Sequence, residues 1–121
     1  MLFDMNENEI THLPHQEDYD RWRANLSNAD YQGIIDELHL IFEKAGQEDK
    51  PVRASYIPGK NWEGTVYQPI YHACGDNFDI AKLFFGLLVW EAAQSHDKKW
   101  VFIREDKGTD DKPFGLTYFR R

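Results

Sequence analysis

A chain of 121 residues has the length of one domain folded around one core, and we expect residues 1–121 to form a single domain. Hydrophobic residues make up 41% of the chain and charged residues 29%, which argues against disorder. The one cysteine, Cys74, excludes an internal disulfide and an all-cysteine metal site. Because the chain shows neither a basic signal-like N-terminus nor an 18-residue apolar run, we expect a cytoplasmic protein that does not enter the membrane.

The negative charge is concentrated in the first part of the sequence. The formal net charge is −7. Residues 1–50 hold twelve acids and four bases, a balance of −8, whereas residues 51–121 hold nine acids and ten bases, a balance of +1. An acidic surface repels phosphates and attracts basic proteins through its long-range field. The same charge is also consistent with a purely solubilising role.

The first half of the chain predicts two helices. Residues 1–15 fit no element clearly, although residues 2–5 are a candidate edge strand, and 16–26 has the apolar spacing of a short amphipathic helix. Residues 27–30 carry N-cap chemistry and precede the clearest helix of the chain, which we expect to stop at Gly46. Its core-facing repeat consists of Ile34, Ile35, Leu38, Ile41, Phe42 and Ala45.

The second half alternates strands and helices. Residues 52–57 alternate as a half-buried strand, with Val52, Ala54 and Tyr56 on one face. A capping box formed by Thr65 and Gln68 opens a short helix that ends near Cys74. Residues 76–77 cap a helix over 78–94, which is apolar almost all round and is therefore expected to be buried. Residues 99–105 and 114–119 predict a β-hairpin with a long tip at 106–113.

From residue 28 onward, the predicted order α-β-α-α-β-β resembles that of winged-helix domains, with 16–26 as an extra N-terminal helix. The resemblance rests on element order and on no residue motif; it implies an α+β fold in which the hairpin is the wing. A groove-reading helix contacts DNA with basic and amide side chains, of which the helix over 78–94 offers few: Lys82 and Gln94, beside the acids Asp79 and Glu91. The basic residues lie instead on the hairpin side: Lys98, Lys99, Arg104, Lys107, Lys112, Arg120 and Arg121.

No residue pattern points to catalysis, a metal or a cofactor. Cys74 and His72 are two residues apart, so on a helix their side chains point away from each other, and we expect Cys74 to be a packed core residue. Pro14 interrupts the helix that would align His12 with His15. Two further histidines, at positions 39 and 96, are interpreted as isolated. We therefore predict a protein that is not an enzyme, with no catalytic, metal-binding or cofactor-binding residue.

The favoured hypothesis is an acidic protein-binding module that docks on a basic protein, in its most concrete form an inhibitor or immunity protein that neutralises a basic partner such as a nuclease toxin. The alternative is a winged-helix transcription regulator that contacts DNA through the hairpin side; a homodimer stays open in either case. The predicted contact residues of the favoured hypothesis are an acidic face of Asp30, Asp36, Glu37 and Glu43 and two aromatic anchors, Trp22 and Trp62.

Overall fold

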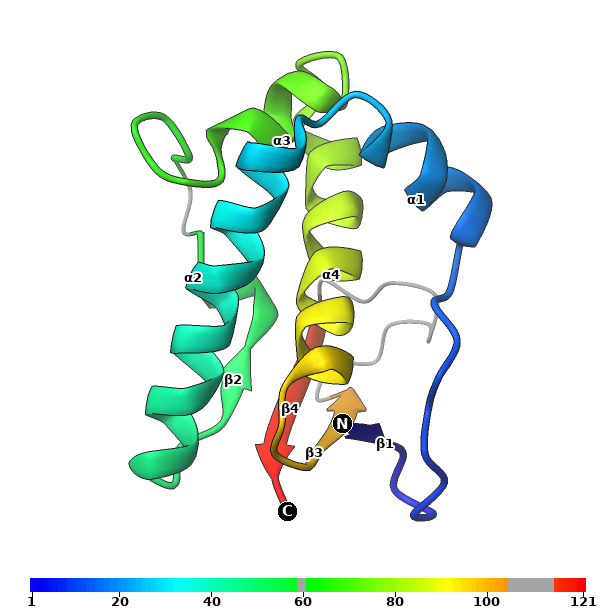
Figure 1. Ribbon diagram of the computed structural model, residues 1–121, viewed down its shortest axis with the longest axis vertical. Helices are drawn as coiled ribbons and strands as arrows, with labels where there is room; N and C mark the ends of the chain where they lie inside the picture. Colours follow the sequence, from blue (N-terminus) through cyan, green and yellow to red (C-terminus); the bar gives the residue numbers. More distant parts are fainter. Residues whose placement is uncertain (59–60, 105–114) are drawn as a thin grey trace.

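The computed structural model describes residues 1–58, 61–104 and 115–121 (Figure 1). Within these ranges the chain forms four α-helices and a four-stranded mixed sheet, so the predicted α+β class is confirmed. The elements are β1 (Leu2–Phe3), α1 (Gln16–Arg23), α2 (Asn28–Gln47), β2 (Val52–Arg53), a 3-10 helix (Ala54–Tyr56), α3 (Gln68–Ala73), α4 (Phe78–Ser95), β3 (Trp100–Arg104) and β4 (Leu116–Arg120). The finer winged-helix assignment stays a prediction.

The two long helices begin where the sequence predicts. The Ser27 hydroxyl accepts a hydrogen bond from the Asp30 N–H at 3.1 Å and caps α2, and the Asn77 side chain accepts one from the Ile80 N–H at 3.1 Å and caps α4. Each cap satisfies a first-turn donor that has no partner within its helix. The end of α2 differs slightly from the prediction, because Gly46 lies inside the last turn and the helix continues to Gln47.

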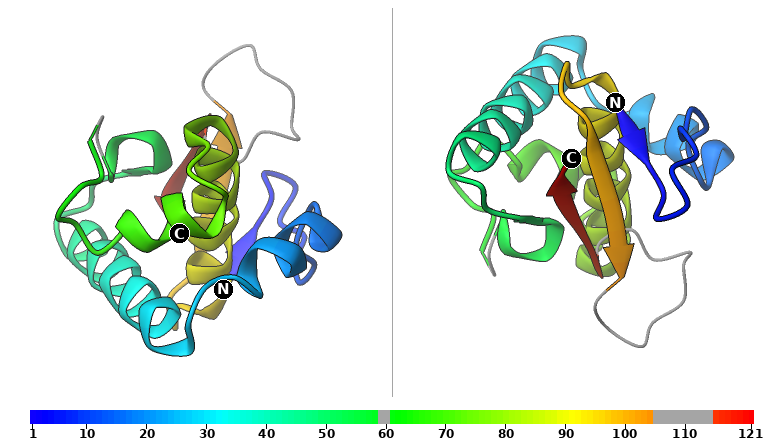
Figure 2. Two further views of the ribbon diagram at one scale, coloured as in Figure 1. Left: turned by 90° about the horizontal axis from the view of Figure 1, so that it is seen from above. Right: turned by 90° about the horizontal axis from the view of Figure 1, so that it is seen from below.

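The sheet has the strand order β1-β3-β4-β2. Strands β3 and β4 pair antiparallel from Trp100 opposite Arg120 to Arg104 opposite Leu116, as the hairpin prediction requires. Strand β2 pairs antiparallel with β4, and the N-terminal strand β1 pairs parallel with β3, at the two edges of the sheet (Figure 2). The predicted hairpin tip at 106–113 lies outside the described residues.

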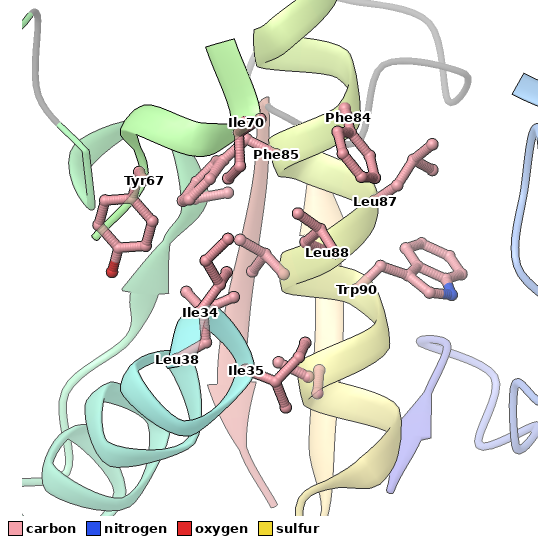
Figure 3. Packing of buried hydrophobic residues seen from close by; sticks show 14 of the residues in the cluster. Ile34, Ile35, Leu38, Tyr67, Ile70, Phe84, Phe85, Leu87, Leu88 and Trp90 are labelled. Carbon is pink, nitrogen blue, oxygen red and sulfur yellow. The ribbon is translucent and has the colours of Figure 1, made fainter. Parts of the chain in front are cut away.

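Helix α4 occupies the centre of the molecule, as its sequence predicts. Ten of its residues are buried, and side chains of α2 and α3 point toward it (Figure 3). Helices α1, α2 and α3 and strand β1 all contact α4, with α1 and α2 on different sides of it (Figures 1 and 2). The described helices include none with the length and apolar character needed to cross a membrane.

A partly buried hydrogen bond provides a partner for the carboxylate that interrupts the apolar surface of α4. Tyr19, on α1, donates its phenolic O–H to the carboxylate of Glu91. Burial raises the pKa of both groups, because the charged form of each loses its hydration. The bond joins α1 to α4 and gives the half-buried carboxylate a hydrogen-bond partner.

Two local predictions are wrong. The strand expected over 52–57 is only Val52–Arg53, because the chain then turns into a 3-10 helix closed by the Ile57 N–H on the Ala54 carbonyl. Tyr56 is consequently 76% exposed instead of buried, whereas Val52 and Ala54 are buried as expected.

The capping box expected before α3 also differs. The Gln68 side chain accepts from the Gly64 N–H at 3.0 Å instead of from Thr65, and the Thr65 hydroxyl accepts from the Tyr67 N–H at 3.2 Å. Helix α3 begins at Gln68, and its N-cap residue, Tyr67, makes no side-chain capping bond.

A matched pair of leucine substitutions tests this distribution of buried surface. Leu88→Ala in α4 removes a fully buried side chain and should lower the free energy of unfolding by about 2–5 kcal/mol. Leu40→Ala in α2 changes a side chain that is 65% exposed and should alter it by less than about 0.5 kcal/mol. Urea unfolding of both variants measures the difference; equal losses would contradict the described packing.

Candidate protein-binding surface

The four acidic residues predicted as a contact face all lie on α2. Apolar side chains of this helix are buried, so the acids are left on its outward side, where Asp30, Asp36 and Glu37 are exposed and Glu43 is half-buried. Helix α2 carries these four acids against one base, Lys44, a formal charge of −4 + 1 = −3. The helix therefore presents a negatively charged face to any approaching molecule.

An exposed leucine lies among these carboxylates. Leu40 is 65% exposed, and it is four residues from Asp36 and three from both Glu37 and Glu43. Residues three and four apart are neighbours on a helix surface, so carboxylates flank Leu40 on both sides along the helix. Sequence reasoning missed Leu40, although its position outside the core-facing repeat of α2 was a usable signal.

The loop before α3 extends this face. Val66 is 39% exposed, and its Cγ2 lies 3.9 Å from the position that a Cβ would take at Gly33 on α2. Burial raises the pKa of the Tyr67 phenol, and the nearby Glu37 carboxylate raises it further. We call the resulting area, formed by Asp36, Glu37, Leu40, Glu43 and Val66, the α2 surface.

His96 fixes one end of the α2 surface. Its Nδ1 accepts hydrogen bonds from the Lys98 N–H at 3.2 Å and from the Trp100 indole N–H at 3.1 Å. The ring proton is therefore on Nε2, which donates to the Glu43 carboxylate at 3.1 Å. The interpretation of His96 as an isolated loop histidine is wrong, because it is buried and joins α2 to the start of β3.

The same bonds argue against a metal at this position. Ligand atoms of Glu43, His96 and Asp97 lie within 4.8 Å of one another. A neutral histidine that binds a metal through Nε2 must carry its proton on Nδ1. In this structure two N–H donors already point at Nδ1, so the arrangement suits a hydrogen-bonded histidine better than a metal ligand.

The two predicted aromatic anchors do not join the α2 surface. Trp22 is half-buried on α1, with its ring 5.8 Å from that of Phe84, and α1 lies on a different side of α4 from α2 (Figures 1 and 2). Trp62 is only 4% exposed and packs against Phe78 and Phe85. With so little of its surface exposed, Trp62 offers almost no contact area to a protein partner in this conformation, which argues against its predicted role as an anchor.

The basic residues of the alternative hypothesis occupy two ends of the β3–β4 hairpin. Four exposed residues gather where β3 begins and β4 ends: Lys98, Lys99, Arg120 and Arg121. Arg104 lies at the other end of β3, about 13 Å along the strand at roughly 3.3 Å per residue, and is half-buried. The guanidinium of Arg121 pairs with Glu7 at 2.8 Å. Lys107 and Lys112 lie outside the described residues.

Cys74 is a core residue, as predicted. It is buried, and burial raises the pKa of its thiol to about 12, so the nucleophilic thiolate is disfavoured. The neighbouring His72 pairs with Asp76 at 2.8 Å instead of with the thiol.

In a comparison with known proteins, no family model, curated protein or solved structure matches the chain.

The His96 network predicts an acid-sensitive contribution to stability. Burial lowers the pKa of His96 below its usual 6.5, against the opposing charges of Asp97 and Glu43. Below pH 6.5 the unfolded chain therefore takes up a proton that the folded protein excludes, and the free energy of unfolding falls as the pH falls. His96→Asn should be less stable than the wild type at pH 7.5, and this difference should shrink at pH 5.

Urea unfolding of both proteins at several pH values measures this difference in the free energy of unfolding. Because both proteins contain the other four histidines, the titration of those residues cancels in the difference. A stability difference that stays constant between pH 7.5 and pH 5 would contradict the role of neutral His96.

Proposed function

We propose that this protein is a non-enzymatic binding module whose α2 surface docks on a basic protein, in its most concrete form an inhibitor or immunity protein that neutralises a basic partner such as a nuclease toxin. The observation that carries this proposal is the exposed Leu40 flanked by the carboxylates of Asp36, Glu37 and Glu43. An apolar anchor with a charged rim is a common arrangement at protein interfaces.

The chemistry of the α2 surface defines its complement. Carboxylates on an exposed helix steer a positively charged partner and chiefly raise the association rate. Leu40 and Val66 supply apolar area that becomes stabilising once the partner excludes water. The partner we expect therefore presents lysine or arginine side chains around a shallow apolar depression.

The burial of α4 also supports this proposal. In the winged-helix resemblance this helix is the one that enters a DNA groove, yet ten of its residues are buried. Near its N-terminus Asp79 lies within 4.0 Å of Lys82, which partly neutralises the ammonium group. A helix with this surface offers little to the phosphates and base edges that DNA binding requires.

A winged-helix regulator that contacts DNA through its hairpin is the second candidate. The observation that favours it is the group of four basic residues at the β3–β4 end, defined above, one of which, Arg120, lies beside the last turn of α2 with its Nη1 3.0 Å from the position that a Cβ would take at Gly46. The ion pair between Arg121 and Glu7 weakens this candidate, since it lowers the positive charge available to phosphates.

Variants of the α2 surface test the favoured function by affinity capture from the source cell. The wild type should capture a basic protein. The variant Leu40→Ala and the double variant Asp36→Asn/Glu37→Gln should bind that protein at least about tenfold more weakly or not capture it at all. The double variant should mainly lower the association rate and flatten its salt dependence. The matched control is Glu48→Gln/Asp49→Asn, which removes two exposed charges just beyond α2.

Recovery of no basic protein, or equal recovery by all variants, would count against the favoured function. A titration with random duplex DNA tests the second candidate function. It starts at low salt, because phosphate contacts are strongest there. Binding at about 50 mM salt that weakens steeply as salt rises would support the DNA-binding alternative. Absence of binding under that condition would remove it.

A further inference from the structure

A second candidate site lies between the loop at 61–64, helix α3 and the beginning of α4. It is a half-open pocket with a volume of about 370 Å³, which falls at the small end of the range for ligand sites. The pocket is lined by Asn61, Trp62, Glu63, Gln68, Tyr71, His72 and Phe78. None of these residues belongs to the α2 surface, so this inference does not rest on the proposed function.

Aromatic rings held by packing form the apolar part of the pocket. The Trp62 ring lies 5.2 Å from that of Phe78 and 5.5 Å from that of Phe85, between centroids, and is fixed in the core. The half-buried Tyr71 ring lies 5.7 Å from the His72 ring on α3. Rings that are already ordered lose little conformational entropy when a flat or slender group packs on them.

The polar part is rich in hydrogen-bond acceptors. His72 Nδ1 lies 2.8 Å from the Asp76 carboxylate, which places the proton of a neutral ring on Nδ1 and makes Nε2 an acceptor. The Gln68 amide nitrogen lies 3.5 Å from that Nε2, as expected for a donor near an acceptor. Glu63 contributes the one carboxylate among the described residues that line the pocket. A ligand that supplies N–H donors and positive charge complements this set.

An ammonium group of the chain itself illustrates how these rings attract cations. Lys82 Nζ lies 4.7 Å from the centroid of Phe78, in the geometry of a cation–π contact. Asp79, at 4.0 Å from the same nitrogen, partly balances its charge, so Lys82 does not repel a second cation at full strength.

We propose that this pocket binds an organic cation, an ammonium or guanidinium group carried on a flat or slender apolar body. The body would pack on Tyr71 and the neighbouring rings. Its N–H groups would pair with Glu63, and one would take the place of the Gln68 amide at His72 Nε2. The same chemistry is available from a free small amine and from an arginine side chain of a protein, and separate probes distinguish these two sources.

The test uses two cations and one neutral control, each titrated into the isotope-labelled full chain and followed by NMR. The cations are phenethylammonium, for the small amine, and N-acetyl-arginine amide, for the side chain; 2-phenylethanol has the shape of the first without its charge. We expect saturable shifts at residues 61–63, 68, 71, 72 and 78 with at least one cation below about 10 mM, and about tenfold weaker binding of 2-phenylethanol.

Two variants locate the binding groups. Glu63→Gln keeps the shape of the side chain and should weaken cation binding about tenfold, whereas it should leave binding of 2-phenylethanol unchanged. Tyr71→Leu should weaken both cations while the rest of the spectrum shows an intact fold. The matched control is Glu48→Gln, an exposed acid outside the pocket, which should bind as the wild type does.

Tighter binding of the amine supports a small-molecule site, and tighter binding of the arginine probe supports a side-chain pocket. The proposal is overturned if neither cation shifts the lining residues, if the neutral probe binds as well as the cations, or if Glu63→Gln and Glu48→Gln bind alike. None of these results depends on the α2 surface, so failure here leaves the proposed function standing.

Discussion

The burial of α4 is the constraint on which the rest of the structure depends. A helix that is apolar on nearly every side must be covered on nearly every side. An apolar side chain that stays in water does not contribute the stabilising free energy that its burial would give. In this chain α1, α2, α3, strand β1 and the 3-10 helix contribute to that cover. The Tyr19–Glu91 bond is part of it, since it lets a carboxylate lie within an otherwise apolar contact.

This constraint also decides which surfaces remain for recognition. Since most of α4 is covered by its own neighbours, the contact that we propose with a protein partner is assigned to an element that has a free side. Helix α2 buries its apolar residues against α4 and turns its acids outward, with Leu40 among them. The His96 network then ties Glu43, at one end of that face, to the start of β3, so the position of this carboxylate depends on the folded core.

Local chemistry made much of the fold predictable. The caps at Ser27 and Asn77 and the apolar repeats of α2 and α4 are determined by residues close in sequence, and the structure has them where they were expected. The role of His96 was missed because it depends on Glu43, 53 residues away. The pocket beside α3 was missed for the same reason, since packing against α4 buries Trp62 in a segment that reads as an exposed loop.

Native-state hydrogen exchange tests the central claim most directly, because it measures the free energy at which each amide opens. If α4 is the covered centre of the molecule, amides in its middle should exchange only through global unfolding, with opening free energies equal to that of the whole protein. Amides near the outward ends of α1 and α3 should have smaller opening free energies. The account would be contradicted if amides in the middle of α4 exchanged through a local opening with a free energy below that of global unfolding, while α2 stayed protected.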